Sequence, residues 1–183
     1  TNLVGISNLF SFAYPAVEVL CQEIRRIYPE KKIVLGGPHP SALYDEILKN
    51  VPEVDYIAIG EGEESLLGLV NYLDGKLELH ELSGLATRDD SGEIIVLNSS
   101  KRIKNLNQDN IPFPARHLLP METYIRAQEG HGPSSGRWTS ILSSRGCPYG
   151  CTFCESRRTV WIARSPMDVV DEMEYCLKEW GIN

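Results

Sequence analysis

Short apolar runs alternate with amphipathic segments over residues 1–75 of the chain. The runs suited to buried parallel strands are Leu3–Ser7, Lys32–Leu35 and Asp55–Ile59. Apolar side chains recur at helical spacing over Pro15–Tyr28, Ser41–Lys49 and Glu63–Leu73. Strands that alternate with helices in this way predict an α/β fold, in which helices cover a parallel sheet.

The helical spacing also predicts which side chains face the core. On the first helix they are Val17, Leu20, Cys21, Ile24, Ile27 and Tyr28. On the third helix they are Leu66, Leu67, Val70 and Leu73. We read Cys21 as a buried, small apolar residue, which is the usual environment of a free cysteine.

Residues 76–138 have a different pattern and predict a connector. Leu85–Arg88 and Glu93–Leu97 flank Asp89-Asp90-Ser91-Gly92, which is a β-hairpin signal. Further along, Asn105–Pro120 contains Ile111-Pro112-Phe113-Pro114 and is read as an extended segment. The pattern therefore divides the chain into residues 1–75, the connector 76–138, and residues 139–183.

The last part of the chain predicts one strand followed by one helix. Thr139–Ser143 is the strand, and Pro166–Trp180 is the helix, with Ser165 as its cap and Pro at its first position. The apolar stripe of this helix is Val169, Val170, Met173, Cys176, Leu177 and Trp180. Like Cys21, Cys176 is expected to be buried in the core.

Composition excludes several classes of function. Of the 183 residues, 42% are hydrophobic and 23% are charged, which is ordinary for a globular protein. A net charge of −7 argues against nucleic-acid binding, which needs a basic surface. No apolar run approaches the roughly 18 residues of a membrane helix. Five cysteines without a secretory signal argue against a disulfide scaffold, so we expect a cytoplasmic protein.

The strongest chemical signal is the spacing of Cys147, Cys151 and Cys154. This CxxxCxxC pattern lies in a short loop rich in Gly and Pro, and its thiolates suit an iron–sulfur cluster or zinc. A closed structural zinc site needs four ligands, so three cysteines favour a 4Fe-4S cluster with one iron left open. A zinc knuckle with its fourth ligand elsewhere remains the alternative.

With Phe153 directly before the last cysteine, this motif resembles the signature of radical S-adenosylmethionine enzymes. The resemblance implies that Cys147, Cys151 and Cys154 ligate a 4Fe-4S cluster, with Phe153 beside the cofactor. In that family the open iron binds S-adenosylmethionine, and an electron from the cluster cleaves it to start radical chemistry. Thr139–Ser143 and Pro166–Trp180 would then form the first strand–helix unit of the family's barrel.

Three predicted strands end in loops that could bind a ligand, because ligands of parallel sheets bind at the carboxyl ends of strands. Ser7, Gly36-Gly37 and Gly60-Glu61 stand at these ends. They resemble strand-end motifs of a flavodoxin-like cobalamin-binding domain, which precedes the barrel in one subclass. The resemblance implies that Ser7, Gly36, Gly37, Gly60 and Glu61 contact cobalamin. The axial-histidine motif of such domains is absent, and His39 is read as a loop residue near a helix start.

The neighbouring charged residues are read without a catalytic role, and no catalytic residue is assigned. Carboxylates that favour the positive end of a helix dipole are Glu61, Glu63 and Glu64. Arginines read as solvated loop charges are Arg157, Arg158 and Arg164.

By this resemblance the chain is expected to be a fragment of a longer enzyme. Leu3–Ser7 would be the third strand of its sheet, left as an apolar edge that self-associates or is covered. The fragment itself is expected to be inactive and to bind cobalamin poorly or not at all. The parent enzyme would use a small-molecule substrate and an electron donor, in methyl transfer or oxidative cyclisation. A transfer-RNA methylthiotransferase is the alternative enzyme, but only Cys21 could supply a further cluster ligand in the first part.

Overall fold

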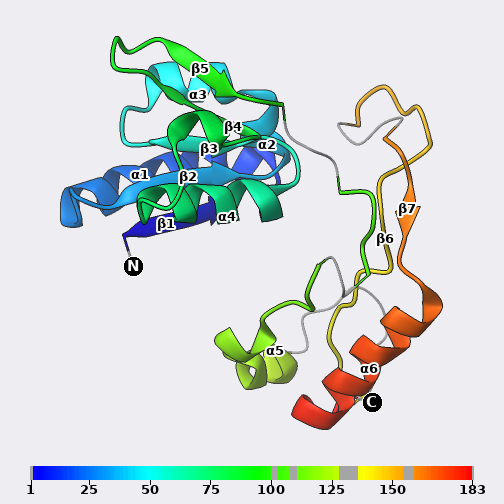
Figure 1. Ribbon diagram of the computed structural model, residues 1–183. Coiled ribbons are helices and arrows are strands. Elements are labelled where there is room, and N and C mark those ends of the chain that lie inside the picture. The colour runs from blue at the N-terminus through cyan, green and yellow to red at the C-terminus, as the bar shows by residue number, and fades with distance from the viewer. Residues whose placement is uncertain (1, 100–102, 108–110, 128–135, 155–158, 183) are drawn as a thin grey trace. The chain divides into compact units, whose positions relative to one another are not determined.

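In the computed structural model the chain forms two units, Thr1–Arg102 and Ile103–Asn183 (Figure 1). The structure describes residues 2–99, 103–107, 111–127, 136–154 and 159–182. None of the helices it describes is long and apolar enough to cross a membrane. The two units are described separately below.

The first unit is built on one sheet with the strand order β1-β2-β3-β4-β5. Its strands are β1 (Leu3–Ser7), β2 (Lys32–Gly36), β3 (Tyr56–Ala58), β4 (Leu85–Arg88) and β5 (Ile94–Leu97). The first three run parallel, and Ser7 lies opposite Gly36 while Leu35 lies opposite Ile57. The predicted α/β fold with a parallel sheet is confirmed.

Helices cover both faces of this sheet. They are α1 (Tyr14–Ile27), α2 (Pro38–Ala42), α3 (Tyr44–Asn50) and α4 (Gly62–Leu73), with single 3₁₀ turns at Ser11–Ala13 and Leu79–Glu81. Cys21 of α1 and Leu48 of α3 pack with Ile33 and Leu35 on one face. Leu69 of α4 packs with Val34 and its neighbours on the other. Alternate residues of β2 thus point to opposite faces, as the pleat requires.

The predicted inward faces of two helices are partly wrong. On α4 the buried residues are Ser65 and Leu69, whereas Leu66, Leu67 and Val70 are exposed. This helix carries two adjoining apolar stripes, and spacing alone does not tell which of them meets the sheet. On α1 the burial of Cys21 is confirmed, but the predicted core residues Leu20, Ile27 and Tyr28 are exposed.

The hairpin assigned to the connector belongs to the first sheet. Its strand β4 pairs antiparallel with β3, and Ala86 lies opposite Ile57. The sequence prediction missed this because β4 packs through fully buried Leu85 and Ala86, which extend the same core. Arg88 on β4 also donates hydrogen bonds to the carbonyls of Leu48, Val51 and Val54. The hairpin therefore completes the end of α3, whose last carbonyls have no partner within the helix.

The second unit contains α5 (Met121–Ala127), β6 (Ser144–Arg145), β7 (Ile162–Ala163) and α6 (Pro166–Trp180), with a 3₁₀ turn at Arg116–Leu118. Ser165 caps α6 by accepting a hydrogen bond from the amide of Asp168, as predicted. The predicted strand Thr139–Ser143 is wrong: only Ser144–Arg145 pairs, and it pairs antiparallel with β7. Among the described residues of this unit, no segment forms a ladder with Thr139–Ser143, and a strand needs a partner of either direction.

The apolar stripe predicted for α6 is partly buried. Cys176 is fully buried, as expected, but Val170, Met173 and Leu177 are exposed. The other side chains that α6 buries are Asp168 and Glu172. In the first unit, β1 stands at one edge of the sheet. Its pairing with a second copy of the chain stays a prediction.

Replacing Arg88 with Met should lower the free energy of unfolding by about 2 kcal/mol or more, because charged hydrogen bonds to backbone carbonyls at the end of α3 are lost. The matched control is Arg26→Met, which removes an exposed ion pair with Glu23 and should change stability far less, because solvent screens exposed pairs. Urea unfolding of both variants provides the measurement. Equal costs would show that Arg88 does not hold α3.

The Cys21 thiol should make stability fall at alkaline pH. Burial, assisted by Glu53 and Glu18, raises its pKa from 9.0 to about 11. The unfolded chain loses this proton first, so the contribution of Cys21 is complete below pH 9.0 and is lost as pH rises to about 11. Urea unfolding across this window should show a smaller decline for Cys21→Ala than for the unmodified chain. An identical decline would contradict the assignment.

Candidate functional site

A cleft of about 470 Å³ opens at the carboxyl ends of the parallel strands of the first unit. Its size is typical of small-molecule sites. The predicted residues that line it are Ser7, Gly36, Gly37 and Gly60. Glu61 does not line it and is instead the residue that precedes α4. Sequence reasoning missed Gly5, Gly62 and Leu66, although a glycine within a strand often marks close approach of a ligand.

The first two loops of this cleft meet backbone to backbone. The amide of Asn8 donates to the carbonyl oxygen of Gly36 at 2.8 Å. Gly37 has φ of 102°, and a Cβ atom there would lie 2.6 Å from the carbonyl oxygen of Asn8. Only glycine fits both the conformation and the contact. Asn8 is itself 2% exposed, and its side-chain oxygen has no hydrogen-bond partner.

Ser41 joins the second and third loops. Its hydroxyl oxygen accepts a hydrogen bond from the amide of Gly60 at 3.0 Å and donates to the carbonyl of Ala58 at 3.4 Å. His39, in the first turn of α2, does not line the cleft: its Nδ1 lies 3.0 Å from the Ser11 hydroxyl, and its ring packs on Tyr14. At its loops the cleft is therefore walled by backbone and small side chains, which lets a ligand approach the main chain closely. Larger side chains complete the lining, namely Ile6, Val34, Leu35, Glu63 and Leu66.

The cysteine motif lies in the loop between β6 and β7 of the second unit. Cys147 and Cys154 are partly buried, Cys151 is exposed, and all are free thiols. The amide of Cys147 donates to the Thr159 hydroxyl at 2.9 Å, and the amide of Cys154 donates to the carbonyl of Cys151 at 3.2 Å. Phe153 is 92% exposed. Among the described residues of this loop and elsewhere, no three metal-ligating side chains converge on one point.

The donor set nevertheless fits a soft metal centre. Three accessible thiols in one loop are the ligands that iron–sulfur clusters take. Cys21 and Cys176 are fully buried, and burial raises the pKa of both thiols. A raised pKa disfavours the thiolate form that binds metal. Thiol chemistry therefore favours the loop cysteines over the other two as metal ligands.

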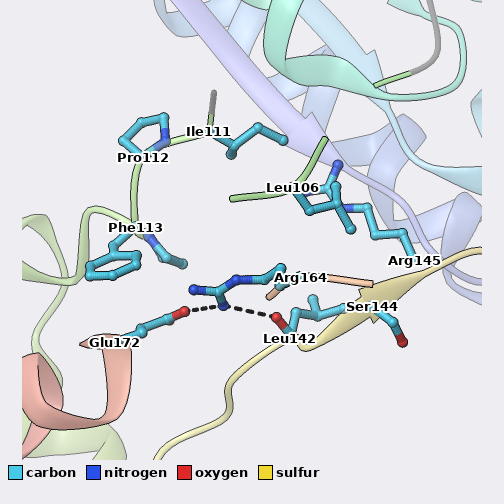
Figure 2. A pocket seen from close by; sticks show the side chains of 10 residues that line it. Leu106, Ile111, Pro112, Phe113, Leu142, Ser144, Arg145, Arg164 and Glu172 are labelled. Carbon is cyan, nitrogen blue, oxygen red and sulfur yellow. Dashed lines mark hydrogen bonds and ion pairs between the residues drawn. The ribbon is translucent and has the colours of Figure 1, made fainter. Parts of the chain in front are cut away.

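The prediction for Arg164 is wrong. It was read as a solvated loop charge, but its side chain is 9% exposed and pairs with Asp168 and Glu172 of α6. A cavity of about 100 Å³ lies beside it, lined by Phe113, Leu142 and other residues of this unit (Figure 2). No signal in the sequence pattern marks these carboxylates as buried, since charged residues are rarely so. Arg157 and Arg158 lie outside the described residues.

Comparison with known proteins finds relatives of the first part of the chain and of the chain as a whole. Residues 1–70 match the model of the B12 binding domain. The whole chain is 30% identical to cytidylyl-2-hydroxyethylphosphonate methyltransferase of Streptomyces wedmorensis and covers 38% of it. Over 99% of the chain it is 31% identical to an uncharacterized methyltransferase of Pyrococcus horikoshii, again covering 38%. It is 30% identical to the anaerobic magnesium-protoporphyrin IX monomethyl ester cyclase of Rubrivivax gelatinosus, covering 99% of the chain and 32% of that protein.

Solved structures share the fold. The cobalamin-dependent S-adenosylmethionine radical enzyme OxsB, solved with aqua-cobalamin and S-adenosylmethionine, superposes on 100% of the chain with a TM-score of 0.73 and 24% identity, and the match covers 24% of OxsB. The radical S-adenosylmethionine methyltransferase TsrM of Kitasatospora setae matches 99% of the chain with a TM-score of 0.68 and 20% identity, covering 36% of TsrM. The chain thus spans little more than a third of the curated relatives that it matches first. By sequence, residues 1–70 match a B12-binding domain, and in fold the whole chain is similar to cobalamin-dependent radical S-adenosylmethionine enzymes.

Proposed function

We propose that this chain serves an enzyme that uses cobalamin and a 4Fe-4S cluster to cleave S-adenosylmethionine reductively and so start radical chemistry. The observation that carries the proposal is the position of the cleft. It lies at the strand ends of the segment that matches the B12 binding domain, while the three-cysteine loop follows in the second unit. A cytoplasmic location, where thiols stay reduced, belongs to the same proposal.

The cleft would receive part of cobalamin, with the nucleotide tail against its glycine walls. Ser7, Gly36, Gly37 and Gly60 would contact it, because they line the cleft and leave the backbone accessible. The hydrogen bonds of Asn8 and Ser41 hold the three loops together before any ligand arrives. Such preorganisation lowers the entropy cost of binding.

Cys147, Cys151 and Cys154 would hold the cluster, and three ligands leave one iron free for S-adenosylmethionine. When bound, the cluster supplies the electron that cleaves S-adenosylmethionine. The residues around it position the thiols: Thr159 holds the backbone of Cys147 by a hydrogen bond of 2.9 Å. Phe153, which is exposed, would flank the bound cofactor. An electron donor for the cluster is a required partner.

Methyl transfer and oxidative cyclisation on a small molecule both fit. The relatives include methyltransferases and a cyclase by name. The described cleft would hold the cofactor and not the substrate, so it does not favour one reaction over the other. A methylthiotransferase is also among the relatives, at 26% identity. It is not favoured here, because such an enzyme would need further cluster cysteines in the first unit. The first unit offers only Cys21, which is fully buried.

Filling the cleft should block cobalamin without unfolding the first unit. A Cβ atom at Gly36 would meet only Ala58, at an ordinary 3.8 Å, so Gly36→Leu places its side chain in the cleft at little strain. In amide NMR spectra, which detect even weak binding, a large excess of hydroxocobalamin should shift the signals of Ser7, Gly37 and Gly60 in the unmodified chain. These shifts should disappear in Gly36→Leu.

Gly36→Ala is the matched control for this experiment and should keep most of the shifts, because it adds a single methyl group. The amides of Gly75 and Gly92, remote from the cleft, should not move in any variant. Cobalamin-induced shifts that survive in Gly36→Leu would show that the cleft is not the binding site.

The loop cysteines should be needed for iron and the buried ones should not. After anaerobic reconstitution, the unmodified chain should contain iron and sulfide and absorb as a brown protein. Cys147→Ser, Cys151→Ser and Cys154→Ser should each lose this absorbance, because a serine hydroxyl is a poor ligand for iron in a sulfide cluster.

Cys176→Ser is the control for the cluster experiment, with circular dichroism to check its fold. It should retain iron, since Cys176 is buried and its pKa is raised. Equal loss of iron in Cys176→Ser would refute the ligand assignment. Binding of zinc without sulfide would instead support a structural zinc site.

A further inference from the structure

A buried group of four charges joins α6 to the segments on both sides of the cysteine loop. Its members are Arg116, Arg164, Asp168 and Glu172, whose side chains are between 1% and 9% exposed. Arg164 pairs with Asp168 at 2.5 Å and also with Glu172. Arg116 pairs with Glu172 at 2.6 Å. Two cations therefore balance two anions in a largely buried place.

Arg164 holds both ends of the loop at once. It follows β7, where the chain leaves the loop, and its amide donates to the carbonyl of Ser143 at 2.9 Å. Its guanidinium donates to the carbonyl of Leu142 at 2.9 Å, where the chain enters the loop. Figure 2 shows the guanidinium pointing to the Leu142 carbonyl and the Glu172 carboxylate together.

Further contacts hold the four charged side chains and the neighbouring segments in place. Arg116 donates to the carbonyl of Ser140 at 2.9 Å, so a second cation fixes the entering segment. The ring of Phe113 lies 5.6 Å from the Arg164 guanidinium. Asn107 accepts a hydrogen bond from the amide of Ser165 at 2.8 Å, beside the start of α6. Only the planar fork of arginine reaches two carboxylates and a carbonyl at once, which a lysine ammonium cannot do.

The ionisation of Arg164 is secure in this setting. Burial opposes its charge, but the hydrogen bonds to Asp168 and Glu172 outweigh that effect and raise the pKa of the guanidinium above its usual value.

The strands at the base of the loop, β6 and β7, contribute only two paired residues each. A ladder that short holds little by itself, so the ion pairs determine how the base of the loop is placed.

We propose that Arg164, held by Asp168 and Glu172, is the positioning residue of the cysteine loop: it joins the entering strand, the leaving strand and α6, so that the thiols are presented in one geometry. Arg164 does not touch the cluster or the substrate, and acts only through the loop. The part of this inference that concerns iron rests on the proposed function, whereas the part that concerns the loop does not.

The test compares Arg164→Gln and Arg164→Lys with the unmodified chain, all without metal. The readings are the alkylation rates of Cys147, Cys151 and Cys154 by mass spectrometry and the hydrogen exchange of residues 142–164. Arg164→Gln should speed both severalfold, while the exchange of the first unit stays unchanged. Arg164→Lys keeps a cation for the carboxylates but loses the hydrogen bond to the Leu142 carbonyl. Its alkylation and exchange rates should therefore lie between those of the unmodified chain and those of Arg164→Gln.

The matched control is Arg126→Gln. Arg126 also pairs with a carboxylate four residues away, that of Glu122, but the Arg126 side chain is 81% exposed. This substitution should change neither reading. After anaerobic reconstitution, Arg164→Gln should lower iron affinity by about tenfold or more, as loss of groups that orient ligands does. The electron paramagnetic resonance signal of the iron that remains should broaden, which a loss of overall stability alone would not cause.

Unchanged alkylation and exchange in Arg164→Gln would overturn the proposal. If Arg164→Gln unfolds, the same two readings on Arg164→Lys decide, and values equal to those of the unmodified chain overturn it. An unmodified chain that binds no iron would count against the proposed function alone, because alkylation and exchange still report on the loop.

Discussion

The parallel hydrogen-bond ladder of β1, β2 and β3 is the constraint on which the first unit depends. Its register sets Ser7 beside Gly36, and β3 follows through Leu35 and Ile57. Because parallel strands end at the same edge, the three following loops have to meet there. Gly37 then allows the backbone of Asn8 to approach, where any side chain would collide. The cleft is a consequence of this ladder and of small residues at its end.

The second unit is held together differently. It buries few apolar side chains, among them Ile103, Leu106, Met121 and Ile125, and it also buries Arg116, Asp168 and Glu172. Buried ion pairs add little net stability over apolar residues, but breaking one of them is costly because a charge is left alone. They therefore specify an arrangement more than they strengthen it. These ion pairs lie at the base of the cysteine loop, which needs a defined geometry to hold a metal centre.

Much of the fold could be predicted from the sequence, because it follows local rules. The strands Leu3–Ser7 and Leu85–Arg88 and the helix Pro166–Trp180 have the predicted bounds, since apolar runs, turn residues and caps act locally. The burial of Cys21 and Cys176 followed from helical spacing. The strand-end residues Ser7, Gly36, Gly37 and Gly60 followed from the rule for parallel sheets.

The rest depends on contacts between distant residues. The pairing of β4 with β3 joins residues about 30 apart, and nothing near Leu85 specifies that partner. The inward face of α4 depends on how the sheet meets two adjoining stripes. Arg164 was misread because a charge in a loop is usually solvated, and only its two carboxylate partners make burial tolerable.

The central claim is that the three-cysteine loop holds a cluster with one iron open to S-adenosylmethionine. The most direct measurement is electron paramagnetic resonance of the reconstituted, reduced chain with and without S-adenosylmethionine. If one iron has no protein ligand, the cluster signal should change when S-adenosylmethionine is added. It should not change with an equal concentration of 5′-methylthioadenosine, which lacks the amino and carboxylate groups that can chelate iron. A cluster signal that is identical with and without S-adenosylmethionine would contradict the claim.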